Sequence, residues 1–279
     1  MDELRAYLQA QAQAQGDLLP WSAQAAAAER FGIPVSQVER VSLEAGLLPA
    51  RYQRNRKIIS TAGQLTLFQS CVAVIGCGGL GGHIVEQLAR LGVGRILAID
   101  PDVFEEHNLN RQLLSSIEGL GQAKVTAARD RVARINPAVT LVPTQVAFGR
   151  TNGTHLLREA TLVVDALDSI PVRLELAQVC QELDIPLVHG AIAGWYGHVA
   201  TQFPGETSVQ EIYRSFVAGK GVEQQLGNPS FTPAVVASLE VAEACKILLN
   251  EGQPLRGRKL AVDLLDMEFH DITLEQQTG

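Results

Sequence analysis

Residues 71–82 read CVAVIGCGGLGG, and the fold of this chain follows from that stretch. Its first part, Val72-Ala73-Val74-Ile75, is a continuous apolar run, which is typical of a parallel strand buried on both faces. The glycines after it let the backbone turn tightly and approach a ligand, and the helix that follows offers free N–H groups to phosphate. The stretch predicts a strand, a nucleotide-binding loop and a helix, with the loop contacts made by Gly76, Gly78, Gly79 and Gly81.

Apolar runs and segments with helical spacing alternate along the rest of the chain. Strands are expected at residues 71–75, 95–99, 140–144, 162–165 and 186–190, and helices at 80–91, 122–135, 151–159 and 172–183. This rhythm predicts an α/β fold with a Rossmann-like, doubly wound, mostly parallel sheet. A later helix at 233–249 precedes two strand-like runs, 259–265 and 268–274, which we expect to extend one edge of the sheet as an antiparallel addition.

Residues 1–50 form a different region, rich in Ala and Gln, with few strand formers. Residues 21–31 and 36–45 read as two short helices, the second capped by Ser36, with Gly32-Ile33-Pro34 between them. The pair resembles half of a helix-turn-helix unit, but no basic stripe favours DNA binding, and a small helical extension is the simpler interpretation. We therefore expect an N-terminal helical extension, 1–50, and one main domain, 51–279.

Composition excludes several classes of protein. Among 279 residues, 23 Lys and Arg face 30 Asp and Glu, and a net charge of −7 argues against a nucleic-acid binder. We find no apolar run long enough to cross a bilayer and no signal-peptide pattern at the start, so we expect a cytoplasmic protein. The cysteines form no CxxC pair and read as reduced thiols, with Cys77 a small filler in the glycine loop. They are Cys71, Cys77, Cys180 and Cys245.

Charged residues beyond the loop separate ATP chemistry from NAD chemistry. Asp100 ends the second strand, where a carboxylate can accept hydrogen bonds from a ribose. Arg111 and Lys124 can neutralise a departing pyrophosphate, and Asp168, just past a strand, can hold Mg²⁺. Taken singly, Lys124 reads as a solvated helix residue and Asp168 as a cap. Together they favour an enzyme that splits ATP between its α- and β-phosphates, because hydride transfer needs none of them.

The order of these motifs resembles the MoeB, ThiF and HesA family, relatives of the ubiquitin-activating enzymes. The likeness runs from residue 51 to about residue 274 and includes Arg51-Tyr52-Gln53-Arg54, the glycine loop, Asp100, Asn108-Leu109-Asn110-Arg111-Gln112, Gly121-Gln122-Ala123-Lys124 and the Asp165/Asp168 turn. The resemblance implies a Rossmann-like enzyme that uses ATP and Mg²⁺ to adenylate a C-terminal carboxylate. The implied substrate is the Gly-Gly end of a ubiquitin-like sulfur carrier protein, MoaD- or ThiS-like, in molybdopterin- or thiamine-type sulfur transfer.

The resemblance also implies a role for each matching residue. Gly79 and its neighbours would line the ATP phosphates, Asp100 would bind the ribose, and Asp168 would hold Mg²⁺. The side chains implied at the β- and γ-phosphates are Asn108, Arg111 and Lys124. Asp102 and Gln112 would complete the nucleotide site.

Arg54 lies in a segment with four cations, Arg51, Arg54, Arg56 and Lys57, which the local fold does not need. From the residues alone, a solvated basic turn explains the segment equally well. The resemblance implies that Arg54 instead crosses a two-fold interface to the ATP phosphates of the partner subunit. That arrangement predicts a symmetric homodimer with two equivalent sites.

Two features depart from the family pattern. Many members hold zinc between two CxxC pairs, but residues 212–215 are Ile-Tyr-Arg-Ser and residues 276–279 are Gln-Gln-Thr-Gly, so we expect no zinc. Residues 222–233, where some members carry an acyl- or sulfur-accepting cysteine, contain none. The alternatives left open are adenylation of a peptide or a small carboxylic acid, a non-catalytic carrier-binding scaffold, and an NAD(P)-dependent oxidoreductase.

Overall fold

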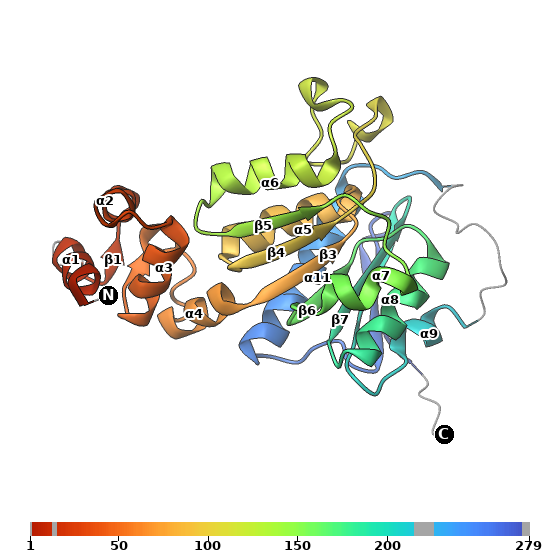
Figure 1. Cartoon of the computed structure of the whole chain (residues 1–279). Coiled ribbons are helices and arrows are strands. Elements are labelled where there is room, and N and C mark those ends of the chain that lie inside the picture. The colour runs from red at the N-terminus through yellow and green to blue at the C-terminus, as the bar shows by residue number, and fades with distance from the viewer. Residues whose placement is uncertain (1, 13–15, 215–225, 275–279) are drawn as a thin grey trace.

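One mixed sheet runs through the molecule in the order β10-β9-β8-β7-β6-β3-β4-β5 (Figure 1). The computed structural model describes residues 2–12, 16–214 and 226–274. The parallel strands are β3 (Cys71–Ile75), β4 (Arg95–Ile99), β5 (Thr140–Thr144), β6 (Leu162–Asp165) and β7 (Leu187–Ala193). The antiparallel strands are β8 (Tyr196–Gln202), β9 (Arg258–Asp263) and β10 (Glu268–Thr273). The expected parallel sheet with an antiparallel C-terminal addition is therefore confirmed.

The predicted strands agree closely with the observed ones. Strands β3 to β6 match residue for residue, whereas β7 starts one residue later than expected and continues to Ala193. Strand β8 was not predicted. Its buried end carries Thr201 and Gln202, and these polar side chains interrupt the apolar pattern that marks a buried strand.

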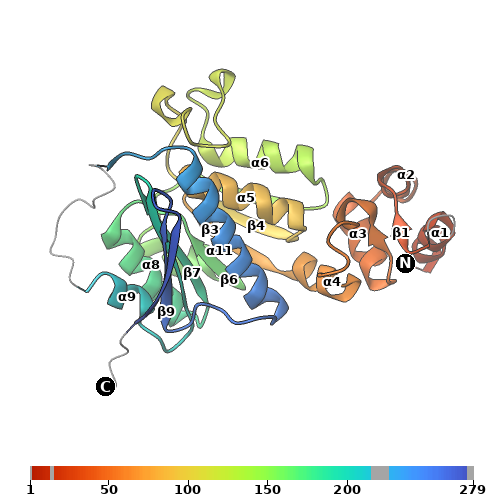
Figure 2. The same ribbon diagram turned by 180° about the vertical axis from the view of Figure 1, so that it is seen from behind.

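Helices cover both faces of the sheet. One face packs on α5 (Gly79–Leu91), α6 (Lys124–Ile135) and α11 (Phe231–Leu249), and the other on α7 (Arg150–Leu157), α8 (Ile170–Glu182) and α9 (Ser208–Ile212) (Figure 2). In β3, Val72 and Val74 join the first core, while Ala73 and Ile75 join the second. This alternation explains the continuous apolar run, because both faces of the strand are buried. All the predicted helices are present, with ends displaced by at most two residues.

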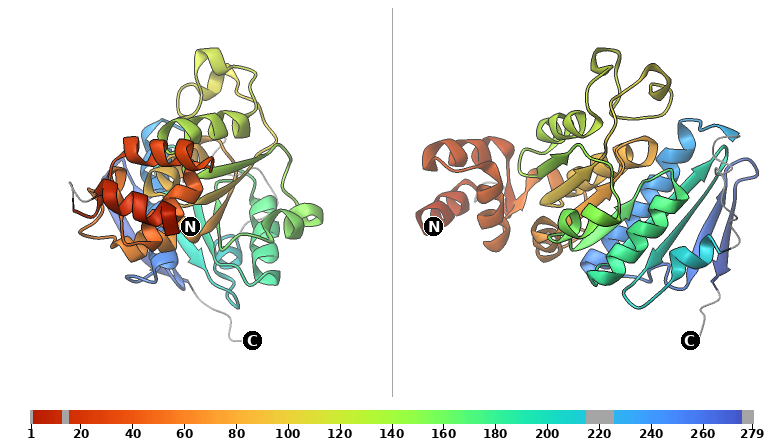
Figure 3. Two further views of the ribbon diagram at one scale, coloured as in Figure 1. Left: turned by 60° about the vertical axis from the view of Figure 1, so that its left-hand side comes forward. Right: turned by 45° about the vertical axis from the view of Figure 1, so that its right-hand side comes forward.

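The N-terminal region is helical, as expected, and lies at one end of the molecule (Figure 3). It contains α1 (Asp2–Ala12), α2 (Trp21–Phe31) and α3 (Val35–Glu44), and the short parallel strands β1 (Leu18–Leu19) and β2 (Leu48–Pro49). Helix α1 and both strands were not predicted. The expected cap at Ser36 is wrong, because Pro34 takes the N-cap position and its carbonyl accepts hydrogen bonds from Gln37 and Val38.

The N-terminal region has an apolar cluster of its own, which includes Leu8, Leu19 and Val41. A second cluster, around Leu43 and Phe68, joins it to the main sheet through α4 (Thr61–Gln69), a helix that was not predicted. One apolar cluster belongs to the N-terminal region alone and the other is shared with the main domain. The boundary between an N-terminal extension and a main domain at residue 50 therefore stays a proposal. Within the described residues, every helix is too short or too polar to span a membrane.

Candidate functional site

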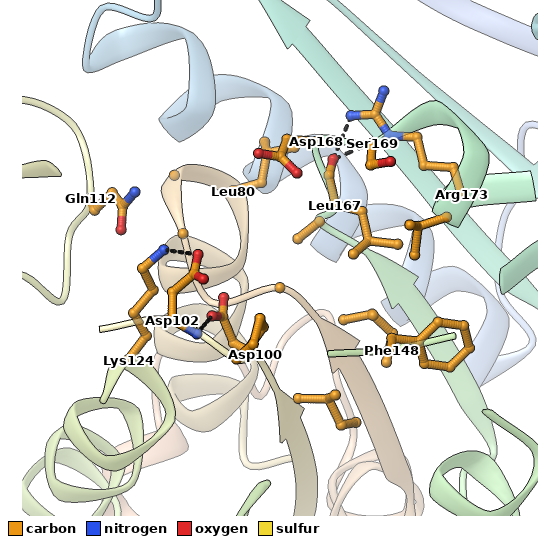
Figure 4. Close-up of a pocket in the computed structure, with 18 of the residues that line it drawn as sticks. Leu80, Asp100, Asp102, Gln112, Lys124, Phe148, Leu167, Asp168, Ser169 and Arg173 are labelled. Carbon is orange, nitrogen blue, oxygen red and sulfur yellow. Dashed lines mark hydrogen bonds and ion pairs between the residues drawn. The ribbon is translucent and has the colours of Figure 1, made fainter. Parts of the chain in front are cut away.

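A cavity of about 440 Å³ lies where β3, β4 and β6 end (Figure 4). Ligands of open α/β sheets bind at this edge, outside the carboxyl ends of the strands. Lys124 and Asp102 stand together on one side of the cavity, and Asp168 and Ser169 stand across from them (Figure 4). The cavity brings together most of the predicted site residues, namely Gly76, Gly78, Gly79, Asp100, Asp102, Arg111, Gln112, Lys124 and Asp168.

The glycines of the loop have different physical roles. Gly76 has a φ of +98°, and a Cβ atom there would lie 2.6 Å from the carbonyl oxygen of Ala166, so only glycine fits. Gly81 does not line the cavity. A Cβ atom at Gly81 would lie 1.8 Å from the carbonyl oxygen of Gly76, so its absence allows α5 to pack directly against the loop. Gly81 was predicted to contact a nucleotide, but it is not among the residues that line the cavity.

Asp100 closes the glycine loop onto β4. Its carboxylate accepts hydrogen bonds from the backbone N–H of Cys77 at 2.6 Å and of Asp102 at 2.8 Å. Burial raises the pKa of Asp100, while these two hydrogen bonds act in the opposite direction. Asp100 lines the cavity, so a contact with a ribose stays a prediction, and the structure adds a second role in holding the loop.

Two cations reach the cavity from different segments. Lys124 is buried in the first turn of α6, with Nζ 2.9 Å from the carboxylate of Asp102, whose side chain is 62% exposed. The Arg111 guanidinium donates hydrogen bonds to the His107 carbonyl at 3.1 Å and to the Asn110 side chain at 2.9 Å. An anion in the cavity would therefore meet positive charge from both segments, together with the N-terminus of α5.

Asp168 is exposed just before α8 and makes no hydrogen bond or ion pair within the described part of the chain. The turn that carries it is nevertheless fixed. Buried Asp165 accepts a hydrogen bond from the Leu167 N–H at 2.9 Å, and Arg173 donates from Nε to the Leu167 carbonyl at 3.1 Å. The backbone that carries Asp168 is thus held in place, and its carboxylate is free to bind a ligand in the cavity.

Sequence reasoning missed two residues that organise this turn. Arg173 lines the cavity with a side chain that is only 2% exposed. His189, on β7, contacts the Asp165 carboxylate through Nδ1 at 2.7 Å, and burial lowers the pKa of its ring. Neither residue has a local sequence signal, because its partner lies on a different strand or loop.

Besides Gly81, two further predicted residues lie outside the cavity. Asn108 is buried at the end of the 3₁₀ turn Glu106–Asn108, where its side-chain oxygen accepts a hydrogen bond from the Glu105 N–H at 2.9 Å. Its carbonyl accepts from the Arg111 N–H at 3.1 Å, so Asn108 supports the segment that carries the arginine. Arg54 lies in an exposed turn.

The expectation that the local fold needs none of the cations around Arg54 is wrong for two of them. Arg51 forms an ion pair with the buried carboxylate of Glu39. Arg56 lies 2.7 Å from the carboxylate of Asp17. Both acids belong to the N-terminal region, so these cations attach that region to the main sheet.

Burial limits the reactivity of the cysteines. Burial raises the pKa of all four thiols, that of Cys245 to about 11, so each is protonated at neutral pH. This supports the interpretation of Cys77 as a filler.

In residues 2–12, 16–214 and 226–274, no group of three or more His, Cys, Asp or Glu could hold a metal ion. Residue 215, residues 222–225 and residues 276–279 lie outside the described part, so the expectations for zinc and for the crossover cysteine stay predictions.

A glycine loop on a parallel sheet, with two cations and a free carboxylate at one cavity, defines a nucleotide-binding α/β protein. The chain belongs to the ThiF family, whose model matches residues 52–279. It is similar to the SAMP-activating enzyme E1 of Haloferax volcanii, with 34% identity over 83% of this chain and 87% of that protein. It is also similar to the sulfur carrier protein adenylyltransferase of Thermus thermophilus, with 35% identity over 81% and 87%. The chain is therefore an ATP-using adenylyltransferase.

Solved structures agree on the fold. MccB of E. coli, solved with ATP, superposes with a TM-score of 0.69 at 22% identity and covers 91% of this chain and 83% of its own. The PaaA structure gives a TM-score of 0.68 at 22% identity over 81% of this chain and 82% of that one. At this identity the likeness concerns the fold alone.

Proposed function

We propose that this protein adenylates the C-terminal carboxylate of a ubiquitin-like sulfur carrier protein that ends in Gly-Gly. The observation that carries the proposal is the pairing of Arg111 and Lys124 with the free carboxylate of Asp168 around one cavity. The relatives named above support the substrate, since one is a SAMP-activating enzyme E1 and the other a sulfur carrier protein adenylyltransferase.

In the proposed reaction the carrier carboxylate attacks the α-phosphate of ATP, and pyrophosphate leaves. Backbone N–H groups at Gly78 and Gly79 face the phosphates from the start of α5. Arg111 and Lys124 neutralise the negative charge that develops on the leaving pyrophosphate. No protein nucleophile takes part in this step, so catalysis rests on position and charge.

Asp168 fits a Mg²⁺ ligand. Its carboxylate is unpartnered in the described structure and lines the cavity, and Mg²⁺ usually takes one or two carboxylates together with substrate phosphates. When bound there, Mg²⁺ supplies additional positive charge to the phosphates of ATP. We further propose that the protein is cytoplasmic and holds no structural zinc. It also forms no covalent intermediate with the carrier, since its buried thiols are protonated at neutral pH.

The test is ATP–pyrophosphate exchange by the purified chain with Mg²⁺ and a Gly-Gly-ended carrier from the same genome. Wild-type protein should show exchange, and Asp168→Asn should lower it by about 100-fold or more, because a neutral amide holds Mg²⁺ poorly. Asp184→Asn, which removes an exposed acid just after α8, is the matched control and should retain full exchange. Full activity in Asp168→Asn would refute the metal assignment.

The same assay separates the alternatives. Exchange with short peptides or small carboxylic acids, but not with the carrier, would indicate the peptide or small-acid activity. Carrier binding without any exchange would indicate a scaffold, and tight NADH binding without exchange an oxidoreductase.

A further inference from the structure

The polar contacts between the N-terminal helices and the main domain centre on one short stretch, residues 51–57, called here the arginine segment. Glu39 of α3 is completely buried and contacts the arginine segment through its carboxylate. One of its carboxylate oxygens pairs with Arg51, and the other accepts a hydrogen bond from the Tyr52 hydroxyl at 2.7 Å. Arg51 also donates a hydrogen bond to the Gln24 side chain of α2 at 2.8 Å.

The main domain completes this network. Asn136, at the end of α6, donates hydrogen bonds at 2.8 Å to the Tyr52 hydroxyl and to the Ala89 carbonyl of α5. Tyr52 is therefore held from both sides, by α3 and by the helices that flank the nucleotide cavity. Each partner of the network is satisfied only when these elements keep their relative positions.

A second contact holds the other end of the arginine segment. Arg56 pairs with Asp17 at 2.7 Å, and both side chains are about 40% exposed. Arg54 lies between the two attachments, is exposed, and makes no hydrogen bond or ion pair with any other described residue. The acids of the N-terminal region thus neutralise the cations on either side of Arg54 and leave Arg54 itself free.

We propose that the N-terminal helices position Arg54 for catalysis, with Glu39 and Asp17 fixing the arginine segment at both ends. This proposal rests on the proposed function and on the homodimer that the family resemblance implies, in which Arg54 reaches the ATP phosphates of the partner subunit. The apolar cluster of Leu43, Leu48, Tyr52, Phe68 and Ala138 also packs the helices against the main domain. The two ion pairs fix the orientation of the segment, because Arg51 lies before Arg54 and Arg56 lies after it. Glu39 and Asp17 are positioning residues and touch no substrate.

Hydrogen–deuterium exchange tests, without any activity measurement, whether the N-terminal helices hold the arginine segment. Glu39→Gln keeps an acceptor for Tyr52 but removes the charge opposite Arg51. The amides of Asn55 and Ile59 donate at 2.8 Å to the Tyr52 and Asn55 carbonyls of the segment, and both amides should exchange faster in this variant. Glu44→Gln removes an exposed acid from the same helix and should leave these amides unchanged. Equal exchange in Glu39→Gln and wild type would overturn the proposal.

A double-mutant cycle tests the link to catalysis. Glu39→Gln should lower kcat for ATP–pyrophosphate exchange by about 10- to 100-fold with little change in KM for ATP, because it misplaces a group that acts on the transition state. In an Arg54→Ala background, Glu39→Gln should cause no further loss of the residual rate. An equal loss in both backgrounds would show a general structural role and overturn the proposal.

Both measurements are repeated with Asp17→Asn, a substitution at an exposed position. If Glu39→Gln does not fold, the results for Asp17→Asn decide whether the N-terminal helices position Arg54. Asp17→Asn should speed amide hydrogen exchange around Arg56. It should lower kcat for ATP–pyrophosphate exchange only when Arg54 is present. If the wild-type protein shows no ATP–pyrophosphate exchange, the proposed function fails, while the amide exchange still decides whether the helices hold the segment.

Discussion

At the scale of single residues, the cavity is built around charges whose surroundings differ. Lys124 is buried against an exposed partner, Asp102, whereas Asp168 is exposed and unpartnered within the described chain. A buried cation is held in place, and its charge is screened little by solvent. An exposed carboxylate can take a ligand at little desolvation cost. The difference suits Lys124 to charge neutralisation and Asp168 to metal binding.

Lys124→Ala should lower kcat for ATP–pyrophosphate exchange by about 100-fold with a small change in KM, because the lysine charge matters most as pyrophosphate leaves. Steady-state kinetics with varied ATP measure both constants. Arg129→Ala removes an exposed cation from the same helix and should behave as wild type. An unchanged kcat with a raised KM would assign Lys124 to binding alone.

Glu240 shows how burial sets a charge state. It is completely buried on α11 beside Gly190, where an added Cβ atom would lie 2.3 Å from its carboxyl carbon. Neither carboxyl oxygen has a hydrogen-bond partner among the described residues. Burial, followed by the charge of Asp165, raises the pKa of Glu240 well above its usual value. The folded state therefore keeps a proton that the unfolded state releases above a pH of about 4.5.

This proton predicts a pH-dependent stability. The contribution of Glu240 is most favourable below its unfolded pKa and is lost as pH rises towards its folded pKa. Glu240→Gln should therefore raise the free energy of unfolding by about 1–3 kcal/mol at pH 7.5 and by less at pH 4.5. Urea denaturation at the two pH values measures this, with Glu251→Gln, an exposed acid just after the same helix, as the control. A variant that is no more stable than wild type at pH 7.5 would contradict the argument.

At the scale of elements, the strand–loop–helix unit β3-loop-α5 joins two cores to one ligand site. Gly79 and Gly81 both belong to α5, yet a Cβ atom at Gly79 would meet Pro233 at an ordinary 3.6 Å. At Gly81 it would collide with the loop backbone. The first glycine therefore leaves room for a ligand, and the second leaves room for the protein itself.

This contrast predicts opposite results for two substitutions to alanine. Gly81→Ala should lower the free energy of unfolding by about 1–3 kcal/mol, because the loop backbone must shift. Gly79→Ala should stay within about 0.5 kcal/mol of wild type but bind ATP more weakly, because its methyl group lies at the phosphate end of the cavity. Denaturation and ATP titration of both variants test the pair, and ATP affinity equal to wild type in Gly79→Ala would remove that glycine from the site.

At the scale of the whole molecule, Arg54 lies outside the cavity of its own chain, so the proposed shared site needs a second subunit. A two-fold contact is self-complementary, and one crossing arginine implies two equivalent sites. Arg54→Ala and Asp168→Asn homodimers should each be nearly inactive. Mixed dimers made by co-expression should recover one working site, which receives both an intact Arg54 and an intact Asp168. Exchange assays on purified mixed dimers measure this.

Mixed dimers that form but stay inactive would show that Arg54 acts within its own chain. Mixed dimers also test the proposed role of the N-terminal helices. A Glu39→Gln chain paired with an Asp168→Asn chain should be active, because the Asp168→Asn chain supplies a well-supported Arg54 to the intact site of its partner.

The sequence by itself determined the parallel part of the sheet, the glycine loop and most of the cavity lining. Buried parallel strands and helix starts leave local patterns, so β3 to β6 and the loop after β3 could be predicted residue by residue. Segments that follow the carboxyl ends of neighbouring strands meet at one edge of the sheet. Asp100, Arg111, Lys124 and Asp168 could therefore be expected together before any coordinates were known.

Only the tertiary structure decided which residues hold these groups in place. Gly81 serves packing, Glu39 holds the arginine segment, and His189 and Arg173 fix the turn before Asp168. The contacts of Glu39 with Tyr52 and of Asp165 with His189 join residues that come together only after folding. A pairing of this kind leaves no periodic signal in the sequence, because its energy depends on burial and distance in the folded chain and not on neighbours along it.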